Sequence, residues 1–196
     1  MPSHIYRKSR SEREFMGFWD KIFGGKKQPA PDIKSINLTE NGVEINGTLV
    51  DIPTHLSVLA KLLGKPRAIG FETDDEIREF LEKSEGEGMV TKRVNYAWDE
   101  LGLLAYTLNG SVVNCFSIQL KPSTSKNAPR GVFGGTATIN GEDWFSVMKS
   151  GKDGMFLAEL RLGNYKIISE KSNFQKSLAE SVREDFNCVD IQLYRD

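Results

Sequence analysis

Few residues in this sequence are of the types that carry nucleophilic or acid–base chemistry. Of its two histidines, His4 lies in the N-terminal segment and His55 lies at the start of a predicted helix, where a capping or surface role is the simpler explanation. A Ser–His–acid or Cys–His arrangement therefore has almost no candidate for its base. The sequence has no Gly-x-Ser-x-Gly, Walker or Gly-x-Gly-x-x-Gly motif, and Gly134-Gly135 is too short to serve as a phosphate-binding loop. We therefore expect a protein that works by binding and is not an enzyme.

The two cysteines, Cys115 and Cys188, each lie in an apolar or strand-like context. Cysteines in such surroundings are more often buried thiols than disulfide partners in a cytosolic protein. Neither belongs to a Cys-x-x-Cys pair, so the sequence gives no indication of a zinc site. We expect neither a metal nor another cofactor.

Carboxylates gather at Asp74-Asp75-Glu76, in the first turn of a helix predicted over residues 75–84. The helix dipole stabilises negative charge at that end, which gives a purely structural interpretation. The alternative is an acidic surface for a partner, because Glu79 and Glu82 lie on the same polar face as Asp75. Adjacent carboxylates can also hold a divalent cation, but the spacing of a calcium-binding loop is absent.

The most distinctive segment runs from Tyr96 to Leu103 and contains both aromatic and acidic residues. One interpretation is a hairpin with a buried Trp98. The other is a binding surface at a loop tip, because tryptophan and tyrosine beside acidic residues are good interface anchors. From the acidic helix and this turn together, the predicted partner-binding residues are Asp74, Asp75, Glu79, Glu82, Trp98, Asp99 and Glu100.

The hydrophobic pattern predicts the strands and helices that position these residues. Asn41-Gly42 and Asn109-Gly110 are strong hairpin turns between alternating segments. Apolar residues at helical spacing predict helices over 55–63, 75–84 and 174–186. No βαβ alternation appears, which favours antiparallel pairing. The predicted fold is α+β, with a mostly antiparallel sheet built from hairpins and about three helices packed on it.

Composition and charge change near residue 31. Residues 1–31 hold seven Lys or Arg and three Asp or Glu, a net charge of +4, which leaves −5 for residues 32–196 because the whole chain carries −1. We predict a flexible basic N-terminal segment over 1–31 and a single α+β domain over 32–196. An acidic domain argues against general nucleic-acid binding. The sequence shows neither a signal peptide nor a membrane span, so we expect a cytoplasmic protein.

The N-terminal segment contains a short predicted amphipathic helix, Gly17 to Phe23. Its apolar face, which has lysines nearby, is of the kind that contacts a membrane surface weakly, and this face consists of Phe18, Trp19, Ile22 and Phe23. The simpler interpretation is a helix that docks on its own domain, or a partly ordered tail. Met16 is an alternative start of the natural chain. A membrane-surface accessory protein is therefore the second function that the sequence suggests.

Three segments carry a resemblance to a family of uncharacterised bacterial proteins. They are the Met-Gly-Phe-Trp-Asp-Lys-Ile-Phe-Gly-Gly-Lys segment that begins at Met16, the Trp-Asp-Glu-Leu-Gly turn at Trp98, and Gly-Gly-Thr-Ala-Thr-Ile-Asn-Gly from Gly134. Over residues 16–145 the chain resembles immunity proteins encoded beside polymorphic toxins, including Rhs-type and type VI secretion effectors. The resemblance implies a cognate protein toxin as partner and inhibition by covering the active site or substrate surface of that toxin. Many toxins have basic clefts, which an acidic domain would complement.

Overall fold

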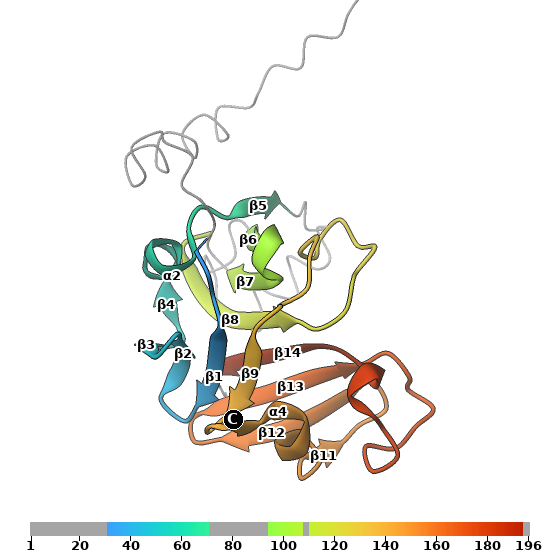
Figure 1. Cartoon of the computed structure of the whole chain (residues 1–196). Coiled ribbons are helices and arrows are strands. Elements are labelled where there is room, and N and C mark those ends of the chain that lie inside the picture. The colour runs from blue at the N-terminus through green and yellow to red at the C-terminus, as the bar shows by residue number, and fades with distance from the viewer. Residues whose placement is uncertain (1–30, 71–93, 108–109, 194–196) are drawn as a thin grey trace, which may run out of the picture.

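The computed structural model describes residues 31–70, 94–107 and 110–193, and these form two β-sheets (Figure 1). The smaller sheet has five strands in the order β10-β9-β1-β2-β3. Its strands are β1 (Ser35–Thr39), β2 (Gly42–Ile45), β3 (Thr48–Val50), β9 (Thr136–Ile139) and β10 (Glu142–Asp143).

The larger sheet has nine strands, eight of them in the order β11-β12-β13-β14-β8-β7-β6-β5, and the ninth, β4, pairs with β8. Every pairing in this sheet is antiparallel. Its strands are β4 (Thr54–His55), β5 (Arg67–Gly70), β6 (Val94–Trp98), β7 (Leu103–Thr107), β8 (Val112–Gln119), β11 (Lys152–Asp153), β12 (Leu157–Leu162), β13 (Tyr165–Lys171) and β14 (Phe186–Leu193).

Alternation of apolar and polar residues directs one face of each sheet into a shared core. In β1, Ile36 and Leu38 are buried, and in β14 Val189 and Ile191 are buried. These residues belong to one hydrophobic cluster that spans both sheets, so the smaller sheet covers part of the larger one (Figure 1). The prediction of helices packed on a single sheet is therefore corrected, because much of the covering layer is a second sheet.

Three tight turns and one long connection build the smaller sheet. Gly42 has φ +132, and a Cβ there would lie 2.4 Å from the Val50 carbonyl oxygen, so the β1–β2 hairpin requires glycine. β1 also pairs with β9 in parallel, with Ile36 beside Ala137. Hairpins alone would give only antiparallel neighbours, so this pairing of distant segments was not predicted. The prediction of a mostly antiparallel, hairpin-rich sheet is otherwise confirmed.

The α-helices of the described residues are α2 (Leu56–Leu63) and α4 (Trp144–Met148), and two 3-10 turns, η1 (Asp99–Leu101) and η2 (Arg183–Asp185), accompany them. In α2, apolar residues at helical spacing are buried, as the sequence predicts: Leu56, Leu59, Ala60 and Leu63. Gly64, with φ 80, ends the helix. The side chain of His55 caps the start of the helix by accepting a hydrogen bond from the Ser57 amide.

The helix predicted over residues 174–186 is wrong. This segment forms turns followed by η2, with Leu178 and Phe186 buried while Phe174 and Val182 remain exposed. Side chains from other elements form hydrogen bonds with backbone groups of this segment. The helix predicted over 75–84 lies outside the described residues. Within residues 31–70, 94–107 and 110–193 the fold is thus β-rich and contains two α-helices, of which the sequence predicts α2. None of the helices in the described ranges has the length and apolar character needed to cross a membrane.

Candidate binding site

The structure places three of the predicted partner-binding residues. Trp98 is only 4% exposed, and its indole N–H donates to the Gly64 carbonyl oxygen at 2.8 Å. This side chain packs in the core beneath the end of α2, so it has almost no surface for a partner, and its assignment as an interface anchor is corrected. Asp74, Asp75, Glu79 and Glu82 lie outside the described residues, together with Phe18, Trp19, Ile22 and Phe23.

Asp99 is engaged in an ion pair on the surface of the fold. Arg67 donates from Nε to Oδ2 and from Nη2 to Oδ1, both at 2.7 Å, and the Arg130 amide also donates to Oδ1. The hydrogen bonds from Arg67 hold the pKa of Asp99 below its ordinary value. Its neighbour Glu100 is exposed and lines an open pocket, so of the three residues at this turn Glu100 is the one that a partner can reach most freely.

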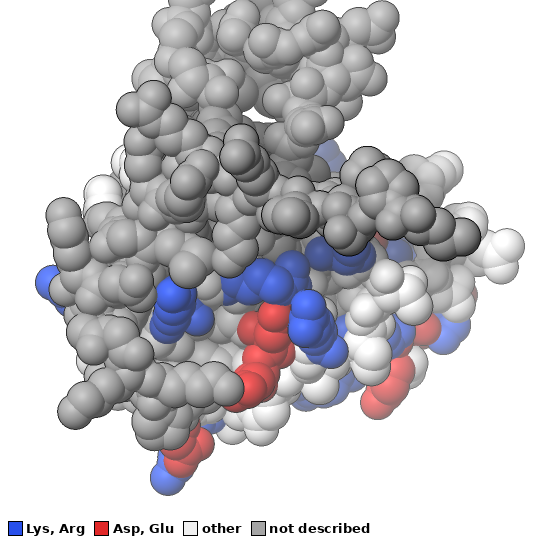
Figure 2. Space-filling model, turned by 90° about the horizontal axis from the view of Figure 1, so that it is seen from above, with Lys and Arg blue, Asp and Glu red and all other residues white. Residues whose placement is uncertain are grey.

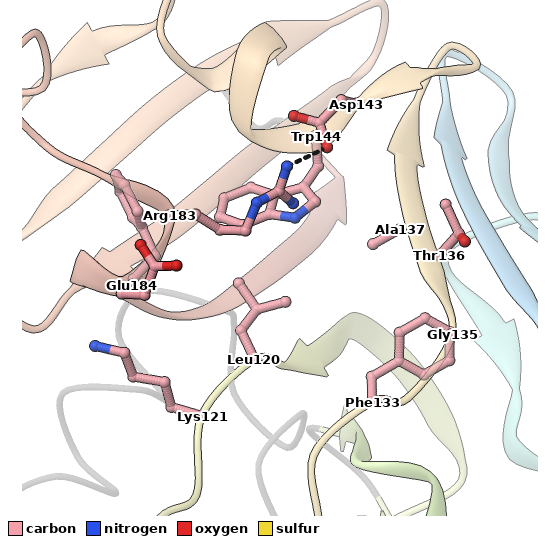
Figure 3. A pocket seen from close by; sticks show the side chains of 11 residues that line it. Leu120, Lys121, Phe133, Gly135, Thr136, Ala137, Asp143, Trp144, Arg183 and Glu184 are labelled. Atoms are coloured by element: carbon pink, nitrogen blue, oxygen red, sulfur yellow. Dashed lines mark hydrogen bonds and ion pairs between the residues drawn. The ribbon is translucent and has the colours of Figure 1, made fainter.

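A pocket of about 450 Å³ lies where the two sheets meet, and we call it the inter-sheet pocket (Figure 3). The smaller sheet and the segments that flank it contribute Phe133, Gly135, Thr136, Ala137, Asp143 and Trp144. The larger sheet and its connections contribute Leu120, Lys121, Arg183, Glu184 and Phe186. Aromatic and aliphatic side chains therefore form much of the lining, and the charged lining residues balance, with two cations and two carboxylates. Pockets of this size and character bind small ligands or single side chains of a partner.

Arg183 is held in place at the edge of this pocket. Its Nη2 donates to Asp143 Oδ1 at 2.6 Å, and its guanidinium carbon lies 5.4 Å from the centre of the Trp144 ring (Figure 3). Asp143 also caps α4 by accepting the Ser146 amide. Partial burial raises the pKa of Asp143, but these hydrogen bonds outweigh it and the pKa lies below its ordinary value. The cation–π contact and the ion pair together fix this wall of the pocket.

A second feature is an exposed apolar patch formed by Met155, Phe156, Leu157 and Phe174, whose exposed fractions are 67%, 57%, 36% and 54%. The Phe156 and Phe174 rings lie 5.7 Å apart at their centroids. The patch joins the β11–β12 turn to the segment that follows β13. Contiguous exposed apolar side chains of this kind are typical of protein interaction sites.

Buried polar contacts hold the 172–185 segment, which carries Phe174. Lys171, whose side chain is 2% exposed, donates to Asp153 Oδ1 at 2.7 Å, and the Leu178 amide donates to Asp153 Oδ2 at 2.7 Å. These hydrogen bonds lower the pKa of Asp153. Lys149 donates to the carbonyl oxygens of Ala179 and Ser181. The segment is therefore fixed in position without being helical.

The carboxyl group of Asp190 is buried on the face of the larger sheet that is turned away from Val189 and Ile191. Burial raises the pKa of Asp190 to about 6, although hydrogen bonds from Ser117 and Cys188 act against it. Its Oδ1 atom is shielded from solvent and has no hydrogen-bond partner. Cys188 and Cys115 are free thiols, and burial raises the pKa of each, so neither is an activated nucleophile here.

Charges elsewhere are mixed. Figure 2 shows lysine and arginine side chains beside acidic ones on the face seen from above, so the described part of that face carries charges of both signs. Within the described ranges, no three His, Cys, Asp or Glu side chains come close enough together to hold a metal ion. The described surface thus offers a pocket and an apolar patch as its candidate binding features.

Sequence reasoning missed both features. The pocket combines residues up to about 65 positions apart in the chain, and no local pattern indicates such a meeting. The patch had a partial signal, because three large apolar residues in a row, Met155-Phe156-Leu157, follow a glycine at a turn. The hydrophobic pattern predicts only a hairpin strand from Phe156 to Leu162 and places Phe174 on the apolar face of the helix predicted over 174–186.

Comparison with protein-family models matches residues 35–154 to the family described as Domain of unknown function (DUF7738). The match covers more than half of the chain, so the protein belongs to this family. It includes the whole smaller sheet, α2, α4 and most of the inter-sheet pocket, and it ends just before the apolar patch. No curated protein and no solved structure matched the chain.

Proposed function

We propose that this protein is a non-enzymatic binding protein that neutralises a cognate antibacterial protein toxin by covering the active site or substrate surface of that toxin. The observation that carries the binding function is the apolar patch of Met155, Phe156, Leu157 and Phe174. Aromatic and methionine side chains are enriched at the centres of protein interfaces, where burying them contributes most of the binding energy.

The rigidity of the patch supports this role. The Phe156 carbonyl oxygen accepts the Lys171 amide at 2.8 Å, and the Gly154 amide donates to the Leu157 carbonyl oxygen at 2.9 Å. On the other side, the ion pair of Lys171 and Asp153 anchors the segment that carries Phe174. A surface held in its binding geometry loses little conformational entropy when a partner docks, so more of the contact energy appears as affinity.

The class of partner comes from the resemblance to immunity proteins. A cognate toxin made in the same cell has to be bound before it acts, which calls for a stable fold and a complementary surface. The net charge of −5 over residues 32–196 suits a basic toxin surface, with Glu100 and the acidic residues of 74–82 as further contacts.

The test is an affinity pull-down of the tagged full chain from its native cells, read by mass spectrometry. We expect one stoichiometric protein partner that is lethal when expressed alone and harmless when expressed with this chain. A Phe156→Ser/Phe174→Ser double variant should lose both the partner and the protection. The matched control is Leu49→Ser/Val58→Ser, which alters two exposed apolar residues, 49% and 40% exposed, on β3 and α2.

Two results would contradict the proposal in different ways. If the patch variant retains the partner and protects cells as well as the wild type, the patch is not the binding surface. If a stoichiometric partner is found but is harmless alone, the protein is a binding protein of another kind and the toxin assignment is wrong.

A further inference from the structure

The described part of the chain begins beside the inter-sheet pocket. A second pocket is lined by Pro31, Asp32, Ile33 and Lys34 on one side and by Glu100 and Leu101 on the other. Both pockets are lined by the same three residues, Phe133, Gly135 and Thr136. The two hollows therefore adjoin along this short segment, and Pro31, where the described residues begin, lines the hollow next to the inter-sheet pocket.

The inter-sheet pocket has the lining that a large apolar side chain needs. Leu120 and Phe133 are partly buried hydrophobic residues packed against the core, and Trp144 and Phe186 lie behind them in a T-shaped contact 5.8 Å between ring centroids. Figure 3 shows the Leu120 and Phe133 side chains on either side of the opening, with Trp144 and Arg183 across from them. Filling such a pocket with an aromatic ring removes apolar surface from water on both sides.

The chain itself carries a segment with matching side chains at a suitable distance. Phe18, Trp19, Ile22 and Phe23 form the predicted apolar face of the N-terminal segment. Phe23 and Pro31 are eight positions apart, which allows a reach of up to about 26 Å when the chain is extended. The lysines between them, Lys26 and Lys27, would pass Asp32 and Glu100 at the second pocket. The net charges of +4 over residues 1–31 and −5 over residues 32–196 favour the same approach.

We infer that the apolar residues of the N-terminal segment, Phe18 to Phe23 of the same chain, occupy the inter-sheet pocket. Docking of this segment buries aromatic side chains that are otherwise available to a membrane or a partner. The inference concerns a site separate from the apolar patch and does not depend on the proposed toxin partner. The inter-sheet pocket is then the binding site for a segment of its own chain. A competing ligand of the pocket, or a competing partner of the segment, would release the segment.

The test uses the full chain with its three tryptophans replaced by 5-fluorotryptophan and observes them by fluorine NMR. Trp98 and Trp144, 4% and 2% exposed, serve as buried references, and Trp19 reports on the segment. A soluble gadolinium chelate broadens accessible signals only. We expect Trp19 to be protected nearly as well as Trp98. The pocket-filling variants Ala137→Leu and Ala137→Phe, at a position of β9 whose side chain faces the pocket (Figure 3), should raise the broadening of Trp19 several-fold.

The control is Leu49→Phe, which adds the same ring to an exposed strand position away from the pocket and should leave Trp19 protected. An unshifted Trp98 signal verifies that each variant is folded. Broadening of Trp19 to the level of a free tryptophan in the wild type overturns the inference. Equal protection of Trp19 in the wild type and in a folded Ala137 variant also overturns it, because the segment then docks elsewhere. Protection that appears only after anionic vesicles are added would assign the segment to a membrane surface instead.

Discussion

Arg67 binds Asp99 through two parallel hydrogen bonds of 2.7 Å, and this pair ties β5, the last strand in the described part of the larger sheet, to the turn that follows β6. Arg67 also donates to the Ala128 carbonyl oxygen at 3.1 Å, so the same guanidinium holds the loop that leads to Phe133. A bidentate arginine–carboxylate pair has fixed geometry. It contributes more to the free energy of unfolding than an ordinary surface ion pair does. Asp99 therefore acts as a structural residue within the predicted binding turn.

The first prediction is that Asp99→Asn lowers the free energy of unfolding at pH 7 by about 1 kcal/mol, because it removes a charged acceptor from Arg67. The pKa of Asp99 is lowered in the folded state, so its contribution is present above the unfolded pKa and disappears as pH falls through the folded pKa. Urea unfolding at pH 7 and at about pH 3 measures both effects, and the difference between variant and wild type should shrink at the lower pH. Glu100→Gln is the control, and an equal loss there would mean that the ion pair is not the cause.

The second prediction concerns Asp190, whose folded pKa is raised to about 6. A group of this kind stabilises the fold below its unfolded pKa and loses that contribution as pH rises through the folded value. The wild type should therefore lose about 2–3 kcal/mol of stability between pH 4 and pH 8 from this residue. The Asp190→Asn variant should be more stable than the wild type at pH 8. Its stability should also depend less on pH between pH 4 and pH 8. Thermal unfolding across this range is the measurement, with the exposed Asp51→Asn as control.

A profile for Asp190→Asn that parallels the wild type would show that its carboxyl group does not titrate in this range. A loss of stability at every pH would mean instead that the hydrogen bonds of the carboxyl group outweigh the cost of its charge. The two outcomes are distinguishable because only the second shifts the whole curve downward.

The third prediction tests the anchor of the 172–185 segment. Asp153→Ala leaves the buried Lys171 ammonium without its counter-ion and should cost about 2 kcal/mol, less than a fully buried pair because Asp153 is partly exposed. Adding Lys171→Met should restore part of the loss, since it removes the unpaired charge. Hydrogen exchange at the Leu178 amide, which donates to Asp153, should accelerate in both variants. Equal stability of the single and double variants would contradict the assigned role of the ion pair.

The fourth prediction concerns the predicted acidic binding residues that lie outside the described ranges. Reversing Asp74, Asp75, Glu79 and Glu82 to lysine should weaken association with a basic partner and reduce its dependence on salt, because long-range attraction is lost. Surface plasmon resonance at two ionic strengths measures both. Circular dichroism has to show an intact fold for the result to count. Unchanged association would remove these four residues from the binding surface.

The sequence predicts local structure well where a few neighbouring residues determine it. The turn at Asn41-Gly42 and the helix ending at Gly64 depend on glycine conformation and on nearby apolar spacing, and both are found. The segment 174–186 has equally good helical spacing, yet it is not a helix. Distant groups, namely Asp153, Lys149 and Lys171, supply hydrogen bonds there that a helix would otherwise provide.

Side-chain exposure was the hardest property to predict for the candidate site. Trp98 and Phe174 are both aromatic residues near polar neighbours, but the first is 4% exposed and the second 54%. Which of them faces solvent depends on whether another element covers it: the end of α2 covers Trp98, while the 172–185 segment presents Phe174 outward. Local composition does not contain that information, because the covering element comes from elsewhere in the chain.

The parallel pairing of β1 with β9 sets an order of assembly. β1 is complete at residue 39, but its second neighbour begins only at residue 136, so nearly a hundred residues have to be synthesised before the smaller sheet can close. Until then β1 is an edge strand with unpaired backbone groups, which are prone to pairing with another chain. Any fragment that ends before β9 should therefore aggregate, and the chain has to pass through this exposed stage each time it emerges from a ribosome.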